Sequence, residues 1–191
     1  QNLRKAIDRA GYRVEELVLS PLASSLAVLR DDSRLAGTAL IEIGGGSTEV
    51  LAFKDERLRL ASTLPWGAAT VSNDIVKGLG VPLAEAEELK ALYGTAQTRR
   101  ADPNEKIGIS GPTPGGRREV SRELLAHIIE QRLDEILGIV FDELEAKHLL
   151  DDLPRGVRCA VRPRSGLVTH SKVSPSSTVA SPSTSRALPR V

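Results

Sequence analysis

Apolar residues recur at helical spacing in several stretches of this sequence. In each stretch they return every three or four positions, which places them on one face of a helix. Prolines near the expected starts and glycines after the expected ends support several of these helices, because each suits that end of a helix. The ranges predicted as helices are 3–10, 21–29, 71–79, 82–93 and 121–150.

Short runs of apolar and β-branched residues lie between these stretches and predict strands. The strands at 39–43, 49–53 and 58–64 follow one another with short turns between them, so we expect an antiparallel meander. Residues 31–33 are expected to form a solvated turn. Because helices and strands are mixed along the chain, the predicted fold class is α/β. The ranges predicted as strands are 14–19, 39–43, 49–53, 58–64, 106–110 and 117–120.

The pattern changes after Val157. From Arg158 to Val191, 15 of the 34 residues are Ser, Thr or Pro, and hydrophobic periodicity disappears. Such a composition buries too little apolar surface to offset the entropy lost on ordering. We therefore predict a folded domain at 1–157 and a disordered tail at 158–191. Two origins of the tail stay open, namely a shifted reading frame or truncated gene, and a natural basic extension.

Composition and charge exclude several classes of function. Residues 1–157 hold 20 Lys and Arg against 25 Asp and Glu, whereas residues 158–191 hold six basic residues and no acidic one. An acidic domain with interspersed charges is not expected to bind nucleic acid. The single cysteine, Cys159, excludes an internal disulfide and a multi-cysteine zinc site. No apolar run has the length of about 18–20 residues that a membrane span needs.

The chain also has features of a fragment. It begins with Gln1, enters a helical pattern directly without a signal peptide, and contains no Met. We therefore expect it to be part of a longer cytoplasmic protein.

One segment, the turn Gly44 to Thr48, is the main candidate for chemistry. It is no Walker loop, because no Gly-Lys-Ser/Thr follows, and no dinucleotide fingerprint, because its glycines lie between two strands. Three consecutive glycines cost roughly 0.5–1 kcal/mol each relative to alanine in regular structure, so they need a physical reason. Either the turn requires positive φ angles, or its backbone N–H groups must approach a phosphate closely.

Neighbouring side chains would complete a phosphate site. The hydroxyls of Ser47 and Thr48 would add two donors, and Glu42, at the end of the preceding strand, would hold a Mg²⁺-bound water. Taken alone, the segment is equally compatible with a plain glycine hairpin.

The order of the motifs is more specific than any one of them. The segment 42–49 resembles the second phosphate loop of the actin, sugar-kinase and heat-shock-type superfamily. Its flanks resemble one family within this superfamily, the bacterial cell-division ATPases of the FtsA family. Residues 16–29 are similar to the family's lead-in strand and helix, and residues 64–75 are similar to its Pro-x-Gly-Gly…Thr-Asn-Asp-Ile signature. Residues 82–94 are similar to the family's helix on the nucleoside side. The resemblance covers residues 1–157.

The resemblance implies one lobe of the actin-like ATPase (ribonuclease-H-like) fold, a mixed sheet with flanking helices. ATP and Mg²⁺ would bind in a cleft between this lobe and a second one. Glu42 is the implied catalytic residue, acting through a Mg²⁺-bound water, and no residue is expected to bind the metal directly. The implied nucleotide-binding residues are Gly44, Gly45, Gly46, Ser47, Thr48, Gly67, Glu87 and Lys90.

Glu87 and Lys90 match the positions that contact the ribose and base. Their alternative interpretation is an i,i+3 ion pair on a helix surface, worth about 0.2–0.5 kcal/mol.

The sequence departs from the family at the ends of the loop. The family usually has Asp where Glu42 and Glu49 stand here, and Thr where Ser47 stands. One extra methylene moves a carboxylate by about an ångström, and a misplacement of that size can cost about 10²-fold in rate. We expect nucleotide binding to tolerate the change better than hydrolysis, so the question of an enzymatic activity stays open.

In function, the resemblance implies an ATP-binding cell-division protein at the cytoplasmic face of the cell membrane. It would assemble with the tubulin-like ring protein FtsZ and associate with itself into filaments. The membrane-binding helix and the adenosine-closing Gly-Gly loop that the family has after position 157 are not recognisable here, so membrane contact is expected only through missing segments. Two alternatives stay open: another actin-superfamily ATPase such as a heat-shock-type chaperone, and an assembly module that binds no nucleotide.

Overall fold

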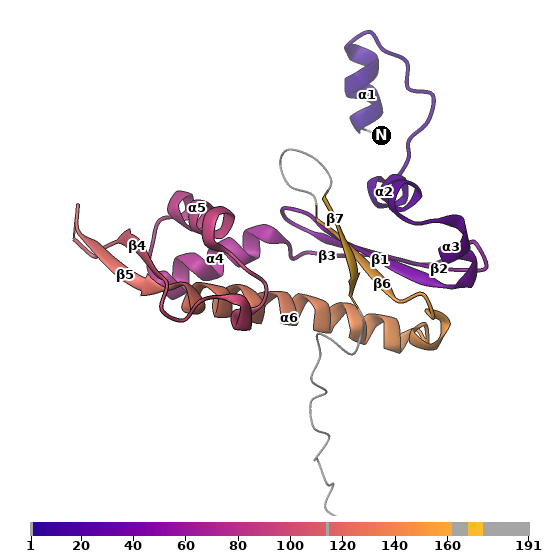
Figure 1. Cartoon of the computed structure of the whole chain (residues 1–191). Coiled ribbons are helices and arrows are strands. Elements are labelled where there is room, and N and C mark those ends of the chain that lie inside the picture. Colours follow the sequence, from indigo (N-terminus) through magenta and orange to yellow (C-terminus); the bar gives the residue numbers. More distant parts are fainter. Residues whose placement is uncertain (1, 114, 162–167, 174–191) are drawn as a thin grey trace, which may run out of the picture.

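The computed structural model describes residues 2–113, 115–161 and 168–173. A sheet with the strand order β3-β2-β1-β6-β7 lies at one end, and a smaller unit of two helices and a β-hairpin lies at the other (Figure 1). The long helix α6 (Arg122–Ala146) runs along both units and joins them. No helix in these residues is long and apolar enough to cross a bilayer.

The expected meander forms half of the sheet. Its strands are β1 (Thr38–Ile43), β2 (Thr48–Lys54) and β3 (Arg57–Leu64), paired antiparallel in that order. Every residue of β1 is buried, because the sheet is covered on both faces there. This double coverage explains why the strand reads as an unbroken apolar run rather than as an alternating one.

Two further strands come from the segment expected to be a tail. Strand β6 (Val157–Val161) pairs with β1 in parallel, and β7 (Val168–Val173) pairs with β6 antiparallel. The expectation of disorder is therefore wrong for 158–161 and 168–173. The reason is that β1 offers an open edge on which a short segment forms a strand, even though its own sequence carries no clear periodicity.

The rest of the expected tail, 162–167 and 174–191, lies outside the described residues. The boundary at 157 and the shifted reading frame stay predictions.

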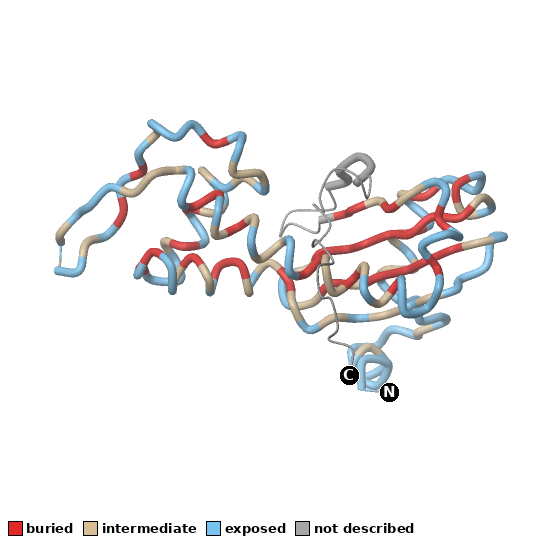
Figure 2. Tube along the Cα trace, turned by 90° about the horizontal axis from the view of Figure 1, so that it is seen from below, coloured by how far each residue is buried: buried red, intermediate tan, exposed pale blue. Residues whose placement is uncertain are grey.

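Helices cover both faces of the sheet. The C-terminal half of α6 packs on one face, and α2 (Ser20–Val28) packs on the other. The buried positions accordingly follow the strands of the sheet (Figure 2). The α6 side buries Ala39, Ile41, Ile43, Val50, Ala52, Leu137, Val140 and Leu144, and the α2 side buries Leu40, Leu51 and Phe53 beneath Leu22 and Val28.

A second core lies in the smaller unit. It forms where α4 (Ala68–Leu79), α5 (Leu83–Tyr93) and the hairpin of β4 (Lys106–Ser110) and β5 (Arg117–Ser121) pack on the N-terminal half of α6. An ion pair from Arg132 to Asp74 adds to the contact between α6 and α4. Leu133 packs against both cores, so α6 connects the sheet to the smaller unit. The second core contains Val71, Ile75, Leu79, Val81, Ala86, Leu89, Ile107, Ile109, Leu125 and Ile129.

The N-terminal region differs most from expectation. Helix α1 (Asn2–Arg9) lies apart from the sheet, and the strand predicted at 14–19 is absent (Figure 1). A strand needs a neighbour to satisfy its backbone groups, and none of the described strands lies beside this segment. The turn predicted at 31–33 is instead a short helix, α3 (Asp31–Ala36), with two aspartates in its first turn where they complement the helix dipole.

Two shorter elements complete the described structure. Single-turn 3₁₀ helices span Thr98–Arg100 and Leu150–Asp152. The predicted helix 121–150 ends earlier, at Ala146, and the second of these short helices takes up its expected last residue.

Cys159 allows a chemical test of β6. It is buried, and this burial raises the pKa of its thiol from 9.0 to about 11. Because the thiolate is the reactive form, we expect native Cys159 to react with iodoacetamide at about pH 8 at least roughly 100-fold more slowly than in guanidinium-unfolded chain. Equal rates in the two states would show that 158–161 does not lie in the sheet.

The same group sets the sign of one pH effect. The folded pKa lies above the unfolded value, so the contribution of the neutral thiol to stability is complete below pH 9.0 and is lost as the pH rises through about 11.

Candidate phosphate-binding loop

The glycine turn is a tight connection between β1 and β2. The Gly44 N–H donates to the carbonyl of Ser47 over 2.8 Å and closes the turn. None of Gly44, Gly45 and Gly46 has a φ angle in the left-handed region. Backbone conformation therefore does not explain why glycine stands at these positions, and the first of the two possible reasons is wrong.

The outer side of the turn is open. A Cβ added at Gly45 or Gly46 would have no described atom within 4 Å. Within the described chain, the N–H groups of Gly45 and Gly46 donate to no backbone carbonyl. Successive backbone N–H groups on an open turn are a common anion-binding arrangement. The glycines thus leave room for a ligand to approach the backbone.

The inner side of the turn is bonded to the start of α4. The N–H groups of Ala68 and Ala69 donate to the carbonyls of Gly44 and Gly45 over 2.9 and 2.8 Å. Gly67 directly precedes Ala68 and packs against the turn. A Cβ at Gly67 would be 2.6 Å from the Gly44 oxygen and 2.9 Å from the Gly45 oxygen. Close backbone approach therefore requires glycine at 67, and the loop and the helix terminus form one unit.

The two hydroxyls after the glycines are already engaged. Thr48 is buried and its Oγ1 donates to the carbonyl of Trp66 over 2.8 Å, while Ser47 Oγ donates to Glu49 Oε1 over 2.8 Å. A carbonyl and a carboxylate only accept, so both hydroxyl protons are used. In this geometry Thr48 holds the connection from β3 to α4, and a role of either hydroxyl as a phosphate donor stays a prediction that would require a change of partner.

Glu42 is fully buried within the sheet. It lies directly opposite Glu49 on the neighbouring strand, on the face that also carries Leu40 and is covered by α2. A carboxylate that is completely covered cannot contact a bound nucleotide without movement of its neighbours, so the geometry adds no support to a catalytic role for Glu42.

Glu87 and Lys90 lie on α5 and reach the start of α4. Lys90 Nζ donates to Glu87 Oε1 over 3.0 Å, so the surface ion pair considered from the sequence is present. Lys90 Nζ also donates to the carbonyl of Ala68 over 3.2 Å. Because the N–H of Ala68 is bonded to Gly44, the structure brings Lys90 beside the residues of the glycine turn.

Ser72 is the residue of this region that sequence reasoning missed. It is fully buried, its Oγ donates to the carbonyl of Ala68 over 3.1 Å, and it contacts both Glu87 and Lys90 through hydrogen bonds. A serine that bonds the carbonyl four residues earlier is common in helices. The sequence signal that could have pointed to Ser72 is its position within the segment 64–75, which resembles a family signature.

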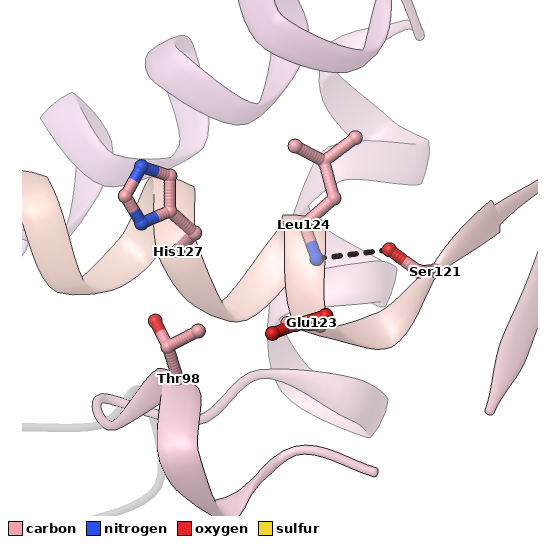
Figure 3. Close-up of a pocket in the computed structure, with 5 residues that line it drawn as sticks. All are labelled: Thr98, Ser121, Glu123, Leu124 and His127. Carbon is pink, nitrogen blue, oxygen red and sulfur yellow. Dashed lines mark hydrogen bonds between the residues drawn. The ribbon is translucent and has the colours of Figure 1, made fainter. Parts of the chain in front are cut away.

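A separate shallow pocket lies at the N-terminus of α6 (Figure 3), with a volume of about 300 Å³. Two of its polar residues have structural partners. The Ser121 hydroxyl accepts the Leu124 N–H over 3.2 Å and caps the helix, and Thr98 donates to Glu130 through its N–H and its hydroxyl. The hydrogen bond from the Thr98 hydroxyl is also the main cause that lowers the pKa of Glu130. The lining residues are Thr98, Ser121, Glu123, Leu124 and His127.

Comparison with known proteins identifies the family. The family model described as cell division protein FtsA matches residues 39–188, which is more than half of the chain. The chain belongs to the FtsA family. This match includes the glycine turn, the start of α4 and helix α5.

Curated FtsA proteins match most of this FtsA-family chain. It is 36% identical over 159 residues to FtsA of Pseudomonas aeruginosa, 34% over 146 residues to that of Escherichia coli and 35% over 155 residues to that of Bacillus subtilis. The first match covers 82% of this chain but only 38% of the Pseudomonas protein. The chain thus spans well under half the length of these relatives.

Solved structures confirm the predicted actin-like fold. MreB5 of Spiroplasma citri, in a crystal structure bound to ADP, superposes with a TM-score of 0.69 at 17% identity, covering 84% of this chain and 52% of MreB5. The ethanolamine utilization protein EutJ of Carboxydothermus hydrogenoformans gives a TM-score of 0.56 at 17% identity, over 83% of this chain and 46% of EutJ. The FtsA-family chain therefore has about half of an actin-like molecule, with a mixed sheet and flanking helices.

Proposed function

We propose that this FtsA-family chain supplies one wall of a nucleotide site, with the phosphates of Mg-ATP bound against Gly45 and Gly46. The observation that carries the proposal is the open outer side of the glycine turn, where the N–H groups of Gly45 and Gly46 donate to no backbone carbonyl of the described chain. The N-terminus of α4 lies against the same turn, and its partial positive charge favours a phosphate nearby.

The remaining contacts would come from the start of α4 and from α5. Gly67 and Thr48 would shape the turn, and Glu87 and Lys90 would contact the ribose and base. Mg²⁺ would neutralise part of the phosphate charge, without a direct ligand from this chain. The ADP in the structure of MreB5, which shares the fold, supports a nucleotide as the ligand.

We propose binding and assign hydrolysis to no residue. Glu42 is covered, and glutamate at 42 and 49 replaces the shorter aspartate usual in the family. Burial keeps the Glu42 carboxylate from a phosphate, and the longer side chain changes where each carboxylate lies.

For the whole protein, family membership supports a role in cell division. We propose that it works at the cytoplasmic face of the cell membrane, associates with itself and with the FtsZ ring, and contacts the membrane through segments other than those described. The family match argues against a heat-shock-type chaperone.

An assembly module without nucleotide remains the second candidate. The engaged hydroxyls of Ser47 and Thr48 and the covered carboxylate of Glu42 favour it, because these groups act within the fold.

Calorimetry with Mg-ATP separates the two candidates. The full 191-residue chain is titrated alone and together with the part of Pseudomonas aeruginosa FtsA that the match does not cover. We expect binding with both parts present, and a rise in thermal stability equivalent to about 2.7 kcal/mol when the ligand is at 100 times its Kd. Folded protein that binds nothing under either condition would favour the assembly module.

A further inference from the structure

The peptide unit between Ala68 and Ala69 links two parts of the proposed site. Its N–H, which belongs to Ala69, donates to the carbonyl of Gly45 in the glycine turn over 2.8 Å. Its carbonyl accepts from Ser72 Oγ over 3.1 Å and from Lys90 Nζ over 3.2 Å. One peptide unit at the start of α4 therefore connects the phosphate loop with a side chain of α5.

Ser72 lies at the centre of this connection. It is fully buried, whereas the side chains of Lys90 and Glu87 are 22% and 52% exposed. Lys90 donates to Ser72, and the Ser72 hydroxyl is shared between the Ala68 carbonyl and Glu87. The hydroxyl is thus both an acceptor for the lysine and a donor to the carboxylate.

Without the hydroxyl, the two long side chains would lose their common partner. Long charged side chains have many rotamers, and holding them in one geometry costs entropy. Lys90 would keep contacts to Ala68 and to Glu87, but the exposed Glu87 is a weak anchor because surface ion pairs contribute little. The glycine turn would keep its own hydrogen bonds to Ala68 and Ala69.

We propose that Ser72 is a positioning residue of the nucleotide site, which holds Lys90 and Glu87 against the helix turn that closes the phosphate loop. This inference rests on the proposed nucleotide-binding function. Ser72 affects recognition of the nucleoside through Lys90 and Glu87 on α5. The phosphates are recognised by the glycine turn, to which the Ser72 hydroxyl makes no hydrogen bond within the described residues.

The test compares Mg-ADP with Mg-pyrophosphate, which lacks the nucleoside, by calorimetry on the full chain under the conditions where Mg-ATP binds. We expect Ser72→Ala to weaken Mg-ADP binding about tenfold, as for the loss of one hydrogen bond to a charged group, and to change Mg-pyrophosphate binding less than about twofold. Ser72→Thr, which keeps the hydroxyl, should restore most of the affinity for Mg-ADP.

A double-mutant cycle tests whether Ser72 works through Lys90. Lys90→Met should weaken Mg-ADP binding, and Ser72→Ala added to it should cause little further loss, because the two residues act as one unit. Asn73→Ala, at an exposed position next to Ser72 on α4, is the matched control and should leave both affinities unchanged. If Ser72→Ala does not fold, Ser72→Cys replaces it, because the thiol is a weaker donor than the hydroxyl. Ser72→Cys should weaken Mg-ADP binding by less than about tenfold and leave Mg-pyrophosphate binding nearly unchanged.

The outcomes are distinct. Equal losses for Mg-ADP and Mg-pyrophosphate, or additive effects of Ser72→Ala and Lys90→Met, would overturn the positioning role while the nucleotide site stands. An unmodified chain that binds neither ligand, alone or with the complementary part, would overturn the proposed function and this inference with it.

Discussion

Gly45→Asp is expected to weaken Mg-ATP binding by at least about 10²-fold while the chain stays folded. The new carboxylate would project from the open side of the glycine turn, directly where the phosphates are proposed to bind. At about 4 Å, two like charges repel by roughly 1–4 kcal/mol in surroundings between bulk water and a protein surface, and the side chain also blocks access to the N–H groups.

Stability should change little in this variant. An added Cβ at Gly45 meets no described atom within 4 Å and the residue does not need a positive φ, so nothing in the fold opposes a side chain there. Gly108→Asp is the matched control, because Gly108 is also exposed with no atom within 4 Å but lies on β4. Calorimetry and thermal unfolding of both variants check the prediction. Full affinity in folded Gly45→Asp would remove the glycine turn from the site.

The parts of the fold that depend on neighbours in the sequence could be predicted. Strands β1 to β3 pair with each other across short turns, so their apolar pattern and their turns carry enough information. Helices α2, α4 and α5 each begin beside a proline or a glycine, and these residues mark their N-termini in the sequence.

The errors arose where a strand depends on a distant partner. Strand β6 pairs with β1 across more than a hundred residues, and its composition alone does not reveal that pairing. Residues 14–19 show the opposite case, because their apolar pattern predicts a strand but no described strand lies beside them. Strand propensity depends on context, so the pattern of a segment is insufficient without its neighbour.

In the candidate site, too, features marked by local motifs could be predicted, and contacts between distant residues could not. The glycine turn and Gly67 could be predicted as a pair, because sequence motifs mark both. The contacts of Ser72 could not be predicted, since they depend on how α5 packs over α4. Nor could the sequence reveal that Ser47 and Thr48 direct their hydroxyls to Glu49 and Trp66.

Gly67→Ala is expected to lower the free energy of unfolding by about 2–4 kcal/mol, as for overpacking combined with loss of hydrogen bonds. The added Cβ would lie 2.6, 2.8 and 2.9 Å from the Gly44 oxygen, the Ser47 nitrogen and the Gly45 oxygen. All three are backbone atoms of the turn, so none can move aside as a flexible side chain would. The turn must separate from α4, which breaks the hydrogen bonds from Ala68 and Ala69.

Urea denaturation followed by circular dichroism measures this loss. Gly138→Ala is the control: Gly138 lies inside α6 and an added Cβ there meets no described atom within 4 Å, so alanine should stabilise the helix by about 0.5–1 kcal/mol. Because the same substitution is expected to act with opposite sign at the two positions, a general effect of alanine is excluded. If Gly67→Ala were as stable as the unmodified chain, the turn and α4 would not be in the close contact on which the site depends. Loss of Mg-ATP binding should accompany the loss of stability, since the N–H groups of the turn would no longer be held in place.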